Sequence, residues 1–176
     1  MNIKSLLPYD RYTLTTRLNE GEVRRRLEAN VAPPKKPFSL LVQRYGLKKN
    51  MTDKPYVGVV VGPRFEIARV INYKNSFLPV TKGEMSNFLG QTEIKVKSSP
   101  HLAVMIFSGV WLFMVLVGCV AVLGASINDG FEPVMLIPFG MFVFGCLLFT
   151  IPYKLEAKKT KRFLAELLEA EEVKEG

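Results

Sequence analysis

The chain has 176 residues, enough for one modest soluble domain and a membrane region but too few for two full-sized domains and an anchor. Its formal net charge is +8, yet 48% of its residues are hydrophobic and its mean hydropathy is +0.15. That combination is unusual for a basic soluble protein and common among membrane proteins. Together with the lack of a nucleic-acid-binding motif, it argues against a nucleic-acid partner and for a membrane protein.

The first elements predicted along the chain are a strand and a short helix. Residues 11–18, RYTLTTRL, alternate apolar or small side chains with more polar ones and predict a strand. Asn19 is a typical N-cap for the helix EGEVRRRLEANV, and Glu22 completes a capping-box pattern. The three arginines at 24–26 are interpreted as a solvated face, with an anionic-partner site as the alternative.

The middle of the chain predicts a sheet. The proline-rich linker APPKKP covers residues 32–37, and no structure is assigned from there to residue 55. Four strand-like pieces follow, separated by turn residues at Gly62-Pro63, Asn75, Gly83 and Gly90: YVGVVVG, RFEIARVINY, SFLPV and QTEIKVKSS. The last piece alternates inward Thr92, Ile94 and Val96 with outward Glu93, Lys95 and Lys97. An antiparallel sheet with one face in water fits this pattern.

An arginine interrupts the apolar row of the second strand-like piece. Alternation places Arg69 on the same side as Phe65, Ile67, Ile71 and Tyr73. Because a guanidinium keeps its charge when buried, it needs carboxylates or carbonyls to bind its donors. The carboxylates considered as partners are those of Asp10, Glu66 and Glu84.

Two interpretations of this arginine remain open. In the first, Arg69 bridges the sheet to a neighbouring helix or loop. In the second, Arg69, Tyr73, Asn75 and Ser76 form a contact site for an anionic ligand or partner. The first is favoured because neither a glycine-rich turn nor a helix N-terminus, the usual parts of a phosphate site, accompanies the strand.

Two apolar runs predict a transmembrane hairpin. Residues 102–125 and 134–153 carry no charged side chain, and at ~1.5 Å per residue each run is long enough to cross a hydrocarbon core of ~30 Å. A kink is expected near Pro138. The joining loop carries Asp129 and Glu132 but no cation, whereas both outer flanks are basic. The positive-inside rule therefore places both termini in the cytoplasm, at a cytoplasmic (inner) membrane.

Cations and small residues around the hairpin suggest its contacts. Seven cations are candidates for anionic headgroups, at about 1 kcal/mol each: Lys95, Lys97, Lys154, Lys158, Lys159, Lys161 and Arg162. Small residues permit close helix approach and leave open a protein partner or a homo-oligomer formed through the hairpin: Gly118, Ala121, Ala125, Gly140 and Gly145. Residues 154–176 predict an amphipathic helix that packs on the cytosolic domain or on a second copy.

Residues with catalytic or metal-binding chemistry are sparse. The single histidine, His101, stands at the start of the first apolar run and is interpreted as an interface residue. Cys119 and Cys146 fall inside the apolar runs without metal-ligand spacing. No nucleophile paired with a base and no phosphate loop is found, so we expect no enzyme activity, cofactor or metal.

The run GPRFEIARVINYKNSFLPVTKG, the strand TEIKVK and the hairpin together resemble uncharacterised bacterial two-span membrane proteins with a cytosolic, loosely PH-like β-rich domain. The resemblance covers residues 55–150, is most specific over 69–79, and implies a bacterial cytoplasmic membrane and a small barrel or curled sheet. It implies no activity.

The sequence therefore predicts an α+β membrane protein with three parts. These are a cytosolic α+β domain over 1–100 with an antiparallel sheet and a short helix, a transmembrane hairpin over 101–153, and a cytosolic C-terminal helix over 154–176. The expected function is that of a membrane-anchored interaction or adaptor module. The alternative is an accessory or structural subunit of a larger membrane complex.

Overall fold

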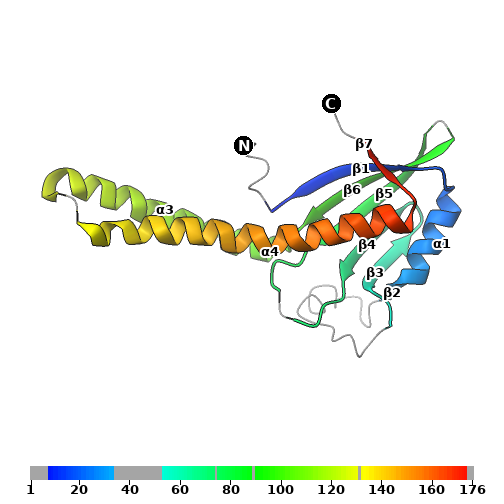
Figure 1. Cartoon of the computed structure of the whole chain (residues 1–176), viewed down its shortest axis with the longest axis horizontal. Helices are drawn as coiled ribbons and strands as arrows, with labels where there is room; N and C mark the ends of the chain where they lie inside the picture. The colour runs from blue at the N-terminus through cyan, green and yellow to red at the C-terminus, as the bar shows by residue number, and fades with distance from the viewer. Residues whose placement is uncertain (1–7, 34–52, 74, 89, 131, 174–176) are drawn as a thin grey trace.

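A computed structural model describes residues 8–33, 53–73, 75–88, 90–130 and 132–173. Within them, helices cover one side of a sheet, and two long helices project from the sheet as a hairpin (Figure 1). Residues 34–52, which make up most of the predicted linker and of the unassigned stretch behind it, lie outside the described residues.

The sheet has seven strands in the order β2-β3-β4-β5-β6-β1-β7, so β2 and β7 are its edges. The strand bounds are β1 Asp10–Thr16, β2 Val31–Ala32, β3 Tyr56–Val61, β4 Arg64–Arg69, β5 Val80–Phe88, β6 Gln91–Ser99 and β7 Glu171–Val173. Every neighbouring pair is antiparallel except β2 and β3, which are parallel. The predicted antiparallel sheet is confirmed for all but this edge pair.

The predicted strand SFLPV is wrong. Its first residues form a turn in which the Asn75 side chain accepts a hydrogen bond from Phe77 N, and only its last residue, Val80, begins β5. The predicted turn at Gly83 is also wrong, because β5 continues through this residue. Gly83 lies opposite Phe65 of β4, and a Cβ added there would stand 2.1 Å from Phe65 Cζ. The glycine leaves room for the aromatic ring and does not end the strand.

One face of the sheet, the core face, carries the hydrophobic core. Alternation along β6 buries Thr92, Ile94 and Val96 as predicted, and β1 buries its apolar side chains on the same face. Helix α1 (Glu20–Asn30) crosses this face and carries the chain from β1 to the opposite edge. The predicted cap is confirmed, since Asn19 Oδ1 accepts a hydrogen bond from Glu22 N.

The hairpin consists of α3 (Leu102–Asp129), a short 3-10 turn η4 (Pro133–Leu136) and α4 (Ile137–Leu167). Pro138 lies in the first turn of α4, where the missing N–H of a proline needs no partner, so the kink expected there is not required. Pro152 lies inside the helix instead, and α4 continues through it.

The segment after the second apolar run is the C-terminal half of α4, which lies across the core face (Figure 1). Its buried residues Leu164 and Leu168 join the core formed by the sheet and α1. The predicted packing of this segment on the N-terminal domain is thereby confirmed. The helix predicted over 154–176 is wrong in its extent, because α4 ends at Leu167 and the chain turns back to form edge strand β7.

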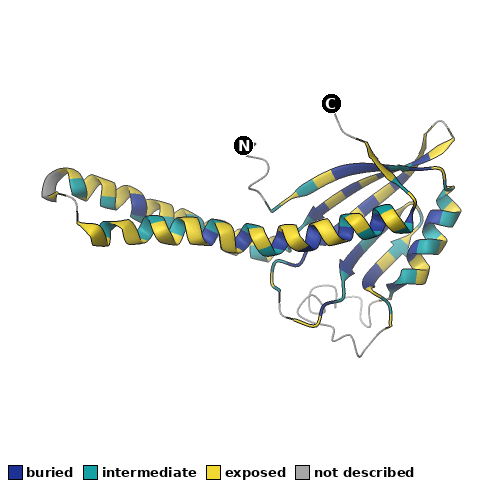
Figure 2. Ribbon diagram, viewed as in Figure 1, coloured by how far each residue is buried: buried dark blue, intermediate teal, exposed yellow. Residues whose placement is uncertain are grey.

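The two helices of the hairpin are long and apolar enough to span a membrane, over Leu102–Ile127 and Pro133–Leu167. In the most apolar 18-residue stretch of each span, only 11% of the residues are buried inside the protein, and Figure 2 shows the hairpin largely exposed. Close helix approach is confirmed at Gly145, where an added Cβ would stand 2.2 Å from the Trp111 ring. Gly118 and Gly140 have open space around them.

The Gly83 contact gives a test of the fold. Replacing Gly83 with valine should destabilise the protein by about 1–3 kcal/mol, because the added side chain displaces the Phe65 ring from a packed core. Thermal unfolding of the full chain in detergent, followed by circular dichroism, measures the loss. Ser86→Val, at an exposed position of the same strand, should change the midpoint little. Equal midpoints for Gly83→Val and Ser86→Val would contradict the packing.

Candidate functional site

A buried carboxylate joins α4 to the sheet. Only 2% of the Glu156 side chain is exposed, and it receives three hydrogen bonds: Arg69 Nη1 donates to Oε2 at 2.7 Å, while the Tyr73 hydroxyl and Lys159 Nζ donate to Oε1 at 2.6 and 2.7 Å. Glu156, Arg69, Tyr73 and Lys159 are called the Glu156 cluster below. It ties β4 and the chain that follows β4 to the helix that continues into the hairpin.

The three donors determine the charge of Glu156. Burial works against its ionisation, but the hydrogen bonds from Lys159, Tyr73 and Arg69 outweigh burial and hold the pKa of the carboxyl below 4.5. Burial and the bond to Glu156 both raise the pKa of the Tyr73 hydroxyl. The cluster is therefore an anion bound by two cations and one neutral phenol at neutral pH.

Further contacts continue along the same side of α4. One turn before Glu156, the Tyr153 hydroxyl donates to the carbonyl of Ser98 at 2.8 Å. One turn after it, Thr160 Oγ1 lies 3.5 Å from the Tyr56 hydroxyl. At the end of the helix, the Thr16 hydroxyl donates to the Leu168 carbonyl at 2.6 Å. A continuous row of contacts thus fixes the helix across β6, β4, β3 and β1.

The first interpretation of Arg69 is correct in kind but wrong in partner. Of the carboxylates considered, Glu66 pairs with Lys82 at 3.0 Å and Glu84 with Arg64 at 2.8 Å, both on the opposite face of the sheet. Arg69 instead binds Glu156, so its charge is already satisfied. This ion pair joins β4 to α4, as the first interpretation expects.

The other candidate residues lie beside this cluster. Tyr73, Asn75 and Ser76 line a shallow cavity of about 430 Å³ together with Lys159 and Glu156. Arg69 does not line it. The structure therefore brings the four candidates to one region, with Arg69 outside the lining and bound to Glu156, which is part of it.

The arginines of α1 also have carboxylate partners. Arg24 lies 3.9 Å from Glu20, and both Arg25 and Arg26 bind Glu22. Arg26 also donates to the Leu167 carbonyl and pairs with Glu169 beyond α4. The predicted solvated face fits Arg24 and Arg25, whereas Arg26 links α1 to the end of α4.

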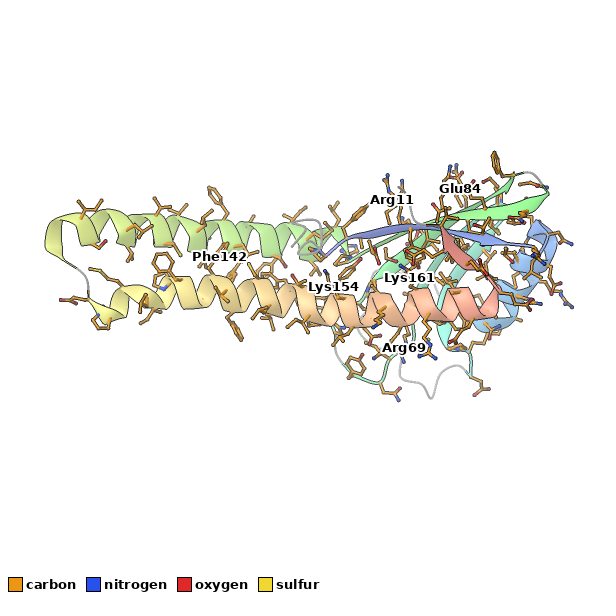
Figure 3. All side chains as sticks on the ribbon, turned by 45° about the horizontal axis from the view of Figure 1, so that its top comes forward. Arg11, Arg69, Glu84, Phe142, Lys154 and Lys161 are labelled. Atoms are coloured by element: carbon orange, nitrogen blue, oxygen red, sulfur yellow. The ribbon has the colours of Figure 1, made fainter. Side chains whose placement is uncertain are left out.

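The flank of α4 that faces β1 carries a basic pocket. Tyr9, Asp10, Tyr153, Lys154, Ala157, Lys158 and Lys161 line this cavity of about 380 Å³ and are called the basic pocket below. Figure 3 shows Lys154 and Lys161 on this flank and Arg69 on the opposite one. Lys161 pairs with Glu172 of β7. Neither Lys154 nor Lys158 makes an ion pair or hydrogen bond with any residue that the structure describes.

The face of the sheet away from the helices, the open face, carries a row of like charges. Register places Lys97 of β6 directly opposite both Lys82 of β5 and Arg11 of β1. Cations directly opposite one another in a sheet are destabilising. Lys82 has Glu66 as a neighbour, and Arg11 Nε donates to the Tyr9 hydroxyl, but Lys97 has no ion-pair partner among the described residues.

Arg11, Lys97 and Lys82 are called the cation row below. Beside it, side chains of β3 to β6 line a hollow of about 470 Å³ on the open face. Its walls include the exposed apolar residues Val59 and Val61.

The seven cations predicted to contact headgroups lie in separate environments. Lys95 and Lys97 are on the open face, Lys154, Lys158 and Lys161 in the basic pocket, Lys159 in the Glu156 cluster, and Arg162 with Glu166.

Glu156 was not among the residues predicted from the sequence. The signal that could have identified it is the spacing of Tyr153, Glu156, Thr160 and Leu164, which places a single carboxylate on the buried side of an otherwise basic helix segment.

Comparisons with protein-family models, with curated proteins and with solved structures found no match. Fold and geometry define a mixed α/β protein with two helices apolar enough to span a membrane.

The Glu156 cluster predicts a pH-dependent stability. Glu156→Gln should cost about 1–3 kcal/mol at neutral pH, because it leaves Arg69 and Lys159 without an anion. The pKa of Glu156 is lower in the folded protein than in the unfolded chain. Its contribution to stability is therefore complete at a pH above the ordinary pKa of a glutamate side chain, and it is lost as the pH falls through the folded-state pKa. The difference in unfolding midpoint between wild type and variant should therefore shrink in acid.

Thermal unfolding across a pH series measures this difference. Glu166→Gln, which removes a carboxylate from an exposed pair with Arg162, should shift the midpoint little at any pH. A Glu156→Gln effect that is constant with pH, or no larger than that of Glu166→Gln, would contradict the assigned role.

Proposed function

We propose that this chain is a membrane-anchored interaction module, with its hairpin in the cytoplasmic membrane of a bacterium and its sheet on the cytoplasmic side. The exposed apolar surface of α3 and α4 supports the anchor. The basic segment after residue 153 and the cation-free loop at the far end of the hairpin support the orientation.

The ends of the described chain fit a topology with two membrane spans. β1 and β7 are adjacent strands of the sheet, so the first and last elements lie on one side of the hairpin. With α3 and α4 crossing the bilayer, both termini belong to the cytoplasmic side.

We assign the interaction surface to the open face of the sheet. The cation row supports this assignment, because Lys97 lies between two other cations, Lys82 and Arg11, and has no ion-pair partner among the described residues. An anionic group of a partner would relieve this repulsion. The adjoining hollow, with Val59 and Val61 in its wall, adds an apolar surface for the same partner. An acidic segment of a protein at the membrane surface matches this charge and shape.

The alternative is an accessory subunit that uses the hairpin to join a larger membrane complex. The exposure of the hairpin is compatible with protein neighbours as well as with lipid. The two functions differ in which surface contacts the partner.

Site-specific photocrosslinking in cells distinguishes them. A photoreactive amino acid at Val61, in the hollow of the open face, should capture one discrete partner. The same group at Val143, on the hairpin, should not capture that partner. Lys97→Glu should reduce the Val61 adduct about tenfold, because it places a negative charge in the cation row.

Arg162→Glu is the matched control, since Arg162 is an exposed cation on α4 remote from the open face. It should leave the adduct unchanged. A discrete adduct from Val143 alone would favour the accessory subunit and contradict the open-face assignment.

A further inference from the structure

We propose that the root of the hairpin binds one anionic phospholipid, with its phosphate in the basic pocket and one acyl chain in an apolar crevice beside it. The inference rests on the proposed membrane insertion of α3 and α4. It assigns a ligand to a site separate from the open face, to which the protein partner is assigned.

The apolar crevice is a cavity of about 360 Å³ between α3 and α4, where the hairpin meets the sheet. Phe77 lies at its sheet end, while Met105, Leu112 and Phe149 of the two helices form much of its wall. Gly109 also lines it, and apart from its chain neighbours and the adjacent backbone of its own helix nothing lies within 4 Å of the position that its Cβ would occupy. The crevice therefore has room for an apolar chain.

One polar group in the crevice lacks a partner. The Ser108 hydroxyl oxygen is buried and makes no hydrogen bond within the described part of the chain. A buried hydroxyl is costly unless it is hydrogen-bonded. The ester carbonyl of a phospholipid lies between phosphate and acyl chain, and is an acceptor that this hydroxyl can use.

The crevice and the basic pocket are neighbours along two segments of the chain. On α4, Thr150 lines the crevice and Tyr153 lines the basic pocket, a separation of ~4.5 Å along the helix axis. At the start of the described chain, Pro8 lines the crevice and Tyr9 the pocket. A single amphipathic molecule can therefore reach both.

The basic pocket has donors for a phosphate. Lys154 and Lys158 have no described partner, and the Tyr9 hydroxyl accepts a hydrogen bond from Arg11 and keeps its own proton to donate. Asp10 is the one carboxylate among the residues that line the pocket, and it opposes an anion. The two unpaired lysines outweigh it.

These features select one class of ligand. A soluble anion would leave the crevice and Ser108 without contacts, and a phospholipid without net charge would leave the two lysines only partly neutralised. A lipid with net negative charge satisfies all of them, and its acyl chain comes from the bilayer in which the hairpin is proposed to lie.

Trp111 is the only tryptophan of the chain and provides the test. Its ring contacts Phe149, a wall residue of the crevice, with centroids 5.7 Å apart. The full chain is placed in phosphatidylcholine nanodiscs that contain a small mole fraction of phosphatidylglycerol or phosphatidylcholine, either one brominated on its acyl chain. Bromine quenches nearby tryptophan, so brominated phosphatidylglycerol should quench Trp111 more strongly than brominated phosphatidylcholine at the same fraction.

The double variant Lys154→Ala/Lys158→Ala should abolish this preference, so that the quenching ratio falls to unity. Gly109→Leu, which fills the crevice, should reduce quenching by phosphatidylglycerol to the level of phosphatidylcholine. Arg162→Ala, the matched loss of a cation on the same helix, should keep the preference. Circular dichroism checks that each variant is folded.

The outcomes separate this inference from the proposed function. Equal quenching by both lipids in the wild type, or a preference that survives the double variant, overturns the lipid site and leaves the anchor intact. Quenching by neither lipid shows that the hairpin is outside the bilayer and overturns both.

Discussion

The arrangement of this molecule depends on the binding of Glu156 by Arg69, Tyr73 and Lys159. A long apolar hairpin and a sheet domain joined only by loops would move independently. Here α4 belongs to both parts, and the buried carboxylate fixes its C-terminal half across the core face. The direction of the hairpin is thereby set by the sheet. An ionic contact also has a geometric requirement that apolar packing lacks, so it specifies one position of the helix along the sheet.

This docking leaves the two faces of the sheet with different tasks. α1 and α4 cover the core face, and their apolar side chains account for its burial. The open face has no helix over it among the described residues and carries the unfavourable cation row. The cation row and the basic pocket both lie near the root of the hairpin, because β6 leads directly into α3 and α4 leads out of the hairpin. If α4 enters the bilayer as proposed, both are close to the membrane surface. The proposed protein partner and the proposed lipid would then bind different surfaces of the molecule.

Local patterns in the sequence predicted much of the fold, and failed where distant residues decide. Alternation in β1 and β6, the cap at Asn19 and the two apolar runs depend on neighbours in the chain and were correct. Gly83 was predicted to be a turn residue, because the Phe65 ring that requires a glycine at this position belongs to another strand. Arg69 was recognised as a residue that needs a carboxylate, but its partner is 87 positions away on α4 and could not be chosen from spacing. The cation row required the register of three strands, which alternation alone does not give.

The rigid connection between hairpin and sheet is the central claim, and a distance measurement tests it directly. Spin labels are placed at Val61 on the open face and Ile127 near the far end of α3, both highly exposed, with Cys119 and Cys146 replaced by alanine. Double electron–electron resonance in lipid nanodiscs should give one narrow distance distribution, which Glu156→Gln broadens. A broad distribution in the chain that retains Glu156 would contradict the account, because the hairpin would then move independently of the sheet.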